Sequence, residues 1–215
     1  MDASTRAALN QALDADMQEM RRKLPLGFAV GNDSSDLGPK GERGFEYLPF
    51  LQQKLQAKGV KVRVMSEMEG VLMRAHAFYS VLEREIAVPK GISGGQLTRL
   101  LVHEFAHALT HEPIMQRIGP FTPYNHGRMI HETVAETVTS LVCRRLSVPT
   151  HYRSLSYIRM LQEATKVSGP EVIEAWSDVI REAVVFMLDG LDSYRQTETF
   201  ANTLKIRIQR QNHNR

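Results

Sequence analysis

The sequence predicts an α+β fold in which a small β-sheet lies beside a long helix and the C-terminal part is mostly helical. Two segments, 4–23 and 96–112, contain no glycine or proline and are rich in helix-forming residues. Between them, 60–64 alternates valine with basic residues, which is typical of a strand. Because strands precede the second helix and more helical segments follow it, the order favours a mixed fold with a small sheet packed on helices.

The composition is that of an ordinary globular protein. Of the 215 residues, 42% are hydrophobic and 24% are charged, which fits one compact domain with terminal additions and excludes a mostly disordered chain. No segment approaches the roughly 18 apolar residues that a membrane span needs. Acidic residues in the first 25 positions argue against a signal peptide. The single cysteine, Cys143, cannot form an intrachain disulfide, so we expect a cytoplasmic protein.

The charge balance argues against two kinds of binding surface on the body of the protein. No acidic residue follows Glu198, whereas four of the 27 basic residues do, so 23 basic and 24 acidic residues lie in the chain up to that point. This balance of −1 predicts neither a basic nucleic-acid-binding face nor the strongly acidic surface of a DNA mimic. We expect no membrane partner, and contact with nucleic acid only weakly, through the basic tail at 193–215.

The N-terminal elements follow from the positions of glycine and proline. Residues 4–23 are expected to form a helix that stops before Pro25, and 27–44, with five glycines, a loop. The leucine spacing in 47–58 predicts a short helix that Gly59 ends, and 60–64 is expected to be a half-buried strand. The chain is therefore divided into an N-terminal helix and Gly-rich loop (1–44), a main domain (45–192) and the tail (193–215).

The remaining strands and helices belong to the main domain. The expected strands are 71–79 and 84–88, and the expected helices are 96–112, 128–146 and 165–190. A turn at 80–83 joins the strands, and an exit loop at 89–95 leads into the first of these helices. The last helix is expected to pack on the core through its apolar residues, as scaffolding.

Histidine is concentrated in one part of the chain. Five of the eight histidines fall within 29 residues, where an even distribution would place about one. His103 and His107 are four residues apart on a predicted helix, about 40° apart around its axis, so both imidazoles project from one face. Two such imidazoles can hold one Zn²⁺ ion at about 2.0–2.1 Å, and Glu104 between them is placed to take a proton from a zinc-activated water.

A catalytic zinc site needs a third protein ligand, and the next predicted helix supplies candidates. Glu132 and Glu136 lie one turn apart on that helix. Two like charges at this spacing are unfavourable unless a cation lies near them. A metal bound by one carboxylate, together with a histidine oriented by the other, would remove this cost.

Other interpretations of these residues stay open. The histidines can form a polar helix face in water, and the two glutamates can form a solvated acidic edge beside Arg128 and Arg144. The motif can also be accidental, since the residue frequencies of this chain produce a chance His-Glu-x-x-His in roughly one of fifty such sequences. Metal analysis separates these interpretations from a zinc site.

The histidine motif and the glutamates that follow it resemble a known pattern. The run His-Glu-Phe-Ala-His-Ala-Leu-Thr-His, with Glu-Thr-Val-Ala-Glu starting 25 residues after His107, resembles the gluzincin pattern. More narrowly, residues 45–190 resemble the zincin domains of the ImmA/IrrE family and the C-terminal zincin domain of ArdC-like antirestriction proteins. The strand-rich segment 60–89 and the stretch from Val134 to Tyr157 extend the similarity beyond the motif.

The resemblance implies a zincin-like metallopeptidase fold and roles for individual residues. His103, His107 and Glu132 would be the zinc ligands. Glu104 would be the general base, and Glu136 would orient a ligand imidazole from outside the ligand set. The chain also departs from the ArdC pattern, because no single-stranded-DNA-binding domain is recognisable in the first 45 residues and an aromatic residue that often follows Tyr-Ile is leucine here. DNA binding is therefore not carried over.

These roles predict a zinc-dependent endopeptidase that hydrolyses peptide bonds of a specific protein partner. The resemblance implies that this partner is a regulator or a defence-related protein, in a setting of phages or mobile elements. The alternative is a non-proteolytic binding or antirestriction protein whose zinc site is structural or vestigial. Intact Glu104 favours hydrolysis, because a binding site needs no general base. Candidates for contacts to the oxyanion or the substrate are His111, Tyr124, His126, His131 and Tyr157.

Overall fold

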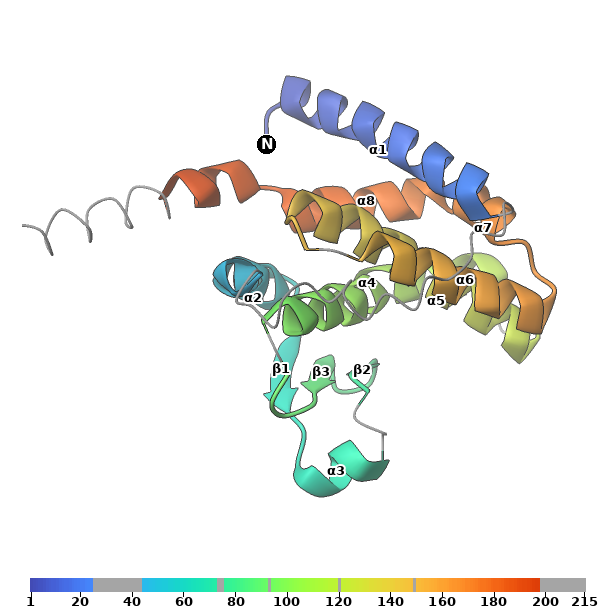
Figure 1. Cartoon of the computed structure of the whole chain (residues 1–215), viewed down its shortest axis with the longest axis horizontal. Helices are drawn as coiled ribbons and strands as arrows, with labels where there is room; N and C mark the ends of the chain where they lie inside the picture. Colours follow the sequence, from blue (N-terminus) through green and yellow to red (C-terminus); the bar gives the residue numbers. More distant parts are fainter. Residues whose placement is uncertain (25–43, 73–75, 93, 120, 149, 198–215) are drawn as a thin grey trace, which may run out of the picture.

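Two long helices form the centre of the molecule, and a small sheet lies on one side of them (Figure 1). The structure, a computed structural model, describes residues 1–24, 44–72, 76–92, 94–119, 121–148 and 150–197. The central helices are α4 (Gly94–Ile118) and α5 (Tyr124–Arg145), which pack along each other. The described part is thus mostly helical with a three-stranded sheet, which confirms the α+β prediction.

The N-terminal helix α1 (Ala3–Lys23) agrees with the predicted 4–23 and belongs to the main core. The Asp2 carboxylate accepts a hydrogen bond from the backbone N–H of Thr5 and so caps the helix. Leu13, Met17 and Met20, spaced at three to four residues, are buried against α7 and α8. Most of the expected glycine-rich loop, 25–43, lies outside the described residues.

The sheet has the strand order β1-β3-β2, so the central strand comes last in the sequence. Its strands are β1 (Lys61–Val64), β2 (Phe78–Ser80) and β3 (Glu85–Val88), with β1 parallel and β2 antiparallel to β3. A 3-10 turn (Phe45–Tyr47) and the helix α2 (Leu48–Ala57) precede the sheet and confirm the helix expected at 47–58.

Strand β1 exists where it was expected, but the prediction that it is half buried is wrong. Val62 is 42% exposed and Val64 is 60% exposed. The physical reason is that β1 lies at an edge of the sheet formed by the described residues, whereas Ile86 and Val88 of the central β3 are buried. The apolar contacts of this segment with the core come from Val60, just before the strand.

The expected strand at 71–79 is only partly correct. Val71 lies in a short helix, α3 (Glu67–Leu72), and the strand is confined to β2. The helix forms because Ser66 and Glu69 make a capping box: the Ser66 N–H donates to the Glu69 carboxylate, and the Glu69 N–H donates to the Ser66 hydroxyl. The Ser-x-x-Glu pattern of a capping box is present in the sequence, and it starts a helix where the apolar residues that follow had suggested a strand.

Both central helices are longer than expected. The helix α4 continues past Glu112 through Pro113 to Ile118, and burial of Ile114 offsets the hydrogen bond that a proline removes. The helix α5 begins at Tyr124, four residues before the expected start, directly after Pro123. In both cases tertiary packing extends a helix beyond the segment that its sequence pattern marks.

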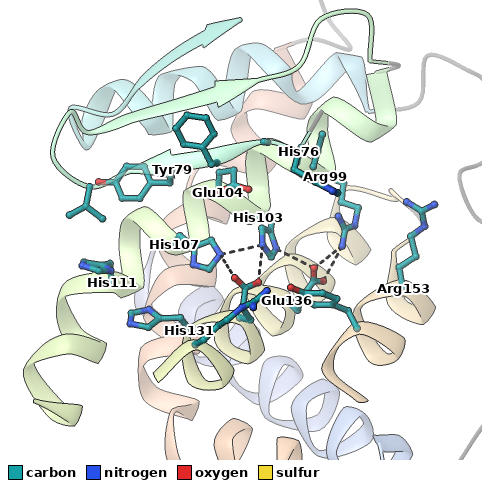
Figure 2. Close-up of a pocket in the computed structure, with 17 residues that line it drawn as sticks. His76, Tyr79, Arg99, His103, Glu104, His107, His111, His131, Glu136 and Arg153 are labelled. Atoms are coloured by element: carbon teal, nitrogen blue, oxygen red, sulfur yellow. Dashed lines mark hydrogen bonds and ion pairs between the residues drawn. The ribbon is translucent and has the colours of Figure 1, made fainter. Parts of the chain in front are cut away.

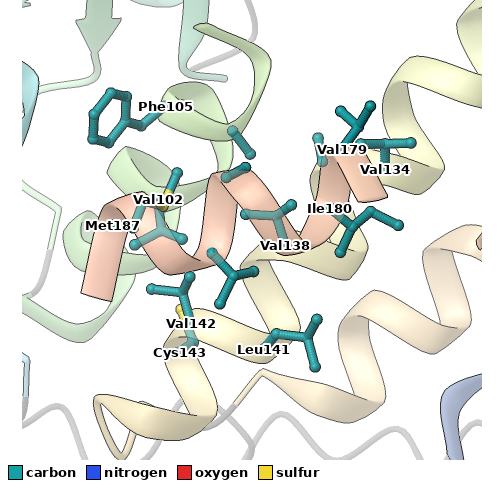
Figure 3. Close-up of a cluster of buried hydrophobic side chains, with 14 of the residues drawn as sticks. Val102, Phe105, Val134, Val138, Leu141, Val142, Cys143, Val179, Ile180 and Met187 are labelled. Carbon is teal, nitrogen blue, oxygen red and sulfur yellow. The ribbon is translucent and has the colours of Figure 1, made fainter. Parts of the chain in front are cut away.

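The C-terminal part is helical, as expected, but the helix predicted at 165–190 is two helices. They are α7 (Gly169–Ala175) and α8 (Ser177–Leu188), separated by Trp176, and α6 (His151–Thr165) precedes them. Ser168 caps α7 through its hydroxyl, with Pro170 in the first turn, so a new helix starts there. Figure 3 shows α8 lying across apolar side chains of α4 and α5, which form the centre of the core.

None of the described helices combines the length and the apolar character needed to cross a bilayer.

Candidate metal centre

The helix α4 presents two different faces. Val102 and Phe105 are fully buried and face the core beside α8 (Figure 3). His103 and His107 project from the other face, with ring centroids 4.8 Å apart. Because the apolar face fixes the rotation of the helix, the imidazoles are held toward α5 and cannot turn into water without breaking the core. The alternative of a solvated histidine face is therefore not what the fold shows.

Three side chains from the two central helices bring ligand atoms together, and we call His103, His107 and Glu132 the donor triad. The two Nε2 atoms are 3.2 Å apart. The Glu132 oxygens lie 3.7 Å from His103 Nε2 and 3.8 Å from His107 Nε2, and one donor atom of each residue lies within 4.8 Å of the others. Ligands at about 2.0–2.1 Å in a tetrahedral site are about 3.3 Å apart, so the donor triad fits a divalent metal ion.

Glu136 lies one turn after Glu132 in a separate set of contacts, which we call the anchor cluster: Arg99, Glu136 and Ser154. Arg99 Nη2 donates to the Glu136 oxygens at 2.8 and 3.1 Å (Figure 2). The Ser154 hydroxyl donates to Glu136 Oε2 at 2.6 Å. Glu136 Oε1 also lies 3.2 Å from His103 Nδ1. When the proton of a neutral His103 ring is on Nδ1 and is shared with Glu136, the Nε2 lone pair of His103 faces His107 and Glu132.

The two histidines of the donor triad differ in protonation. Burial alone would lower the pKa of His103, but hydrogen bonds to Glu132 and Glu136 raise it to about 10. Burial and the charge on His103 together lower the pKa of His107 to about 4. One imidazole is thus a cation and the other is neutral at pH 7. Because Arg99 already pairs with Glu136, the positive charge of protonated His103 balances Glu132, and a metal ion can take the place of this proton.

Glu104 is a buried carboxylate that faces the same cavity. Its side chain is 6% exposed, and burial raises its pKa to about 7. The nearest strand contributes the backbone of Tyr79, whose hydrogen bond lowers this pKa in part. A carboxylate with a pKa near 7 is suited to take up and release a proton at neutral pH.

These residues line a cavity of about 800 Å³ between β2 and the helices α4, α5 and α6. Of the candidates for substrate contacts, His111, His131 and Tyr157 line it, and the rings of His111 and His131 stack at 5.2 Å. The structure places Tyr124 and His126 outside it, both exposed. They lie in the first turn of α5, about two turns before Glu132, where the helix has passed the end of the cavity.

Sequence reasoning missed several residues of this site. Arg99 is four residues before His103, so the spacing that selected His103 and His107 also places Arg99 on the same face. Ser154 lies on a helix that the sequence did not delimit, and Tyr79 acts through its backbone, so neither gave a signal. Cys143 is fully buried, and burial raises the pKa of its thiol to about 12, as expected for a packed thiol rather than a nucleophile.

Comparisons with known proteins give little further information. No protein-family model matches the chain, and no curated protein matches it. A solved structure similar to this chain is the crystal structure of the antirestriction protein ArdC from plasmid R388, in its Mn(II)-bound form. The identity is 21% and the TM-score is 0.48, over 66% of this chain and 51% of that one, so the matched part spans about half the length of ArdC. A similarity at this level does not transfer the role of any residue, and the resemblance to gluzincins and ImmA/IrrE domains stays a prediction from the motif.

Proposed function

We propose that this protein is a metal-dependent hydrolase that cleaves peptide bonds. The observation that carries the proposal is the placement of Glu104, a buried carboxylate with a raised pKa, in the same cavity as three converging metal donors. A site that only binds a metal needs the donors but no proton acceptor beside them.

Each side chain of the site has a distinct proposed role. His103, His107 and Glu132 would hold the ion, while Glu136 keeps the His103 ring oriented. When bound, a divalent metal supplies a Lewis acid that polarises a carbonyl and lowers the pKa of a water molecule. Glu104 accepts the proton of the attacking water and returns it to the leaving amine. Tyr157 lies beside Glu132, from where its hydroxyl can donate to the oxygen on which charge develops.

The proposed metal is Zn²⁺. Two imidazoles and one carboxylate are a common ligand set of catalytic zinc sites, and they leave one position open. Manganese also binds imidazole and carboxylate, and the structural neighbour was crystallised with Mn(II). Both metals therefore belong in the test.

The proposed substrate is a protein or an extended peptide. Among the described residues strand β2 pairs only with β3, and Phe78 and Tyr79 of β2 line the cavity. A peptide that adds to the free edge of β2 would make backbone hydrogen bonds beside the donor triad. The buried, unpaired Cys143 agrees with the proposal of a reducing cytoplasm.

The second candidate is a metal-binding antirestriction protein that cleaves no peptide bond. The structural neighbour is named an antirestriction protein, and this name fits the second candidate better than it fits a peptidase, although a TM-score of 0.48 decides nothing. The two candidates share the metal site and differ in whether Glu104 moves a proton.

Metal analysis combined with an activity assay tests both. We expect one Zn²⁺ per chain in the purified protein, and cleavage of an unfolded test protein such as casein, or of a quenched peptide library, that a chelator stops. Glu104→Gln should keep the metal and lose cleavage by about 10²–10⁴-fold. Metal without cleavage, with no difference between wild type and Glu104→Gln, would establish the second candidate. No metal after reconstitution with Zn²⁺ or Mn²⁺ would reject both.

A further inference from the structure

The charged residues that line the cavity differ in whether they form ion pairs within the described part of the protein. The lining contains three carboxylates and three guanidinium groups. Glu136 and Arg99 pair with each other, Glu132 belongs to the donor triad, and Glu104 is the buried proton acceptor. The other two guanidinium groups are those of Arg128 and Arg153, and both residues are exposed. Among the described residues no carboxylate forms an ion pair with either.

Arg128 and Arg153 come from different helices but open onto the same cavity. Arg128 lies on α5 one turn before Glu132, and its guanidinium group lies against the Tyr157 hydroxyl, which also contacts Glu132. Arg153 lies on α6 directly before Ser154, whose hydroxyl binds Glu136. Figure 2 shows Arg153 on the side of the site where Arg99 and Glu136 lie. The guanidinium group of Arg128 thus lies near the donor triad, and that of Arg153 lies near the anchor cluster.

The sum of charges favours an anionic ligand. With a divalent ion bound, the donor triad carries one net positive charge, which ionised Glu104 balances. The anchor cluster is neutral in itself. Arg128 and Arg153 therefore leave two positive charges that no described lining carboxylate neutralises. A cavity whose net charge is positive attracts an anionic ligand.

We propose that the ligand of this cavity carries a carboxylate, either an acidic side chain or a free C-terminus, next to the group that meets the metal, and that Arg128 and Arg153 bind this carboxylate. The proposal rests on the proposed metal site. Guanidinium groups suit it because they pair with carboxylates through two parallel hydrogen bonds.

The test uses small hydroxamates, which bind the metal through their two oxygens and need no knowledge of the natural substrate. One pair of probes compares the α-hydroxamate of N-acetylglutamate with that of N-acetylglutamine, which differ by one side-chain charge. A second pair compares a malonyl monohydroxamate coupled to alanine with the same compound as its amide, which differ by one terminal charge. Affinities for the Zn²⁺-loaded full chain are measured by titration calorimetry, at low and at raised ionic strength.

In at least one pair we expect the acid to bind about tenfold more tightly than its amide, and the pair that shows this identifies the source of the carboxylate. The preference should weaken at raised ionic strength. Arg128→Gln combined with Arg153→Gln should abolish it and leave the affinity of the amide within about twofold. Arg22→Gln, which changes an exposed arginine on α1, is the matched control and should keep it.

Two outcomes overturn the proposal, and they differ from a failure of the proposed function. Equal affinities of acid and amide in both pairs, in a zinc-loaded protein that binds hydroxamates, reject the anionic ligand and leave the metal site standing. A preference that survives in the double variant rejects the assignment to Arg128 and Arg153. If wild type takes up no zinc and binds neither member of either pair, the proposed function fails together with this inference.

Discussion

Glu132 and Glu136 are the same residue type, one helical turn apart on α5, but they lie in different surroundings. Glu136 is 3% exposed and has a protein cation and a hydroxyl as partners in the anchor cluster. Glu132 faces two imidazoles, and among the described residues no arginine or lysine forms an ion pair with it. The anchor cluster is therefore complete within the protein, whereas the donor triad is complete only when a proton or a metal ion supplies positive charge.

The two glutamates of one sequence motif therefore have two different roles, namely binding the metal ion and holding a ligand histidine in place. The anchor cluster joins α4, α5 and α6 and holds His103 in place. The donor triad binds the ion. Removing a residue from the donor triad should therefore change metal affinity more than folding, and removing one from the anchor cluster should change both.

The largest effect is expected for Glu132→Ala. Loss of one of three donors should lower Zn²⁺ affinity by more than about a hundredfold. That factor is the largest loss expected for a residue that only orients a ligand. The metal-free protein should keep its stability to within about 1 kcal/mol, because the Glu132 side chain is partly exposed and His103 can lose its proton. Competition with a chelating dye and urea unfolding measure the two quantities.

The matched control is Glu163→Ala, which removes an exposed glutamate on α6. It should change neither metal affinity nor stability. Zinc affinity that is the same in Glu132→Ala and in wild type would show that Glu132 is not a ligand.

A smaller loss of affinity is expected for Glu136→Ala, together with a loss of stability. Zinc affinity should fall by about 10–100-fold, since the His103 ring loses its orienting carboxylate. The metal-free protein should lose about 3–5 kcal/mol, because the largely buried Arg99 is left unpaired.

A second substitution distinguishes these two effects. Arg99→Met in the Glu136→Ala background removes the unpaired charge and should restore much of the stability but not the zinc affinity. Recovery of both would mean that Glu136 acts only through folding, and the distinction between the two regions would be lost.

The stability of the metal-free protein should depend on the donor triad and on the anchor cluster in different pH ranges. Contacts with Glu132 and Glu136 raise the pKa of His103 from 6.5 to about 10 in spite of burial, so its stabilising effect is present at low pH and is lost as pH rises through that value. Burial raises the pKa of Glu136, but contacts with His103 and Arg99 lower it to about 2. Its stabilising effect is therefore present above about pH 4.5 and is lost as pH falls toward 2.

The upper window is the more informative one. His107, with a pKa of about 4, has lost its proton below this window, whereas Glu104, with a pKa of about 7, finishes titrating in its lower part, where loss of its proton also lowers the unfolding free energy. Between about pH 7 and 9 the metal-free protein should lose unfolding free energy, while zinc affinity rises by up to about tenfold per pH unit as the proton on His103 is displaced. Unfolding and dye competition at a series of pH values check this. Stability that rises with pH in the metal-free protein over this window contradicts it.

Helical spacing alone predicts that His103 and His107 project from one face, and the next helix offered two glutamates in register, of which only the resemblance selected Glu132. The fold class and α1 could be predicted for the same local reason. The sequence could not show that β1 is an edge strand, because strand order depends on contacts between distant segments. Ser154 and Tyr79 were missed because the former reaches the site through helix packing and the latter through its backbone.

The smallest effect is expected for Ser154→Ala, and it tests whether α6 belongs to the metal centre. The substitution removes a buried hydroxyl that donates to Glu136 at 2.6 Å, but Arg99 and His103 remain as partners of the carboxylate. Stability should fall by about 1–2 kcal/mol, and zinc affinity should fall only a few-fold. Ser156→Ala, two positions along α6 at a half-buried site, is the control and should change neither. Because Ser154 does not touch the donor triad, any loss of zinc affinity must pass through Glu136 and the His103 ring. A loss of stability with unchanged affinity would limit α6 to a scaffolding role.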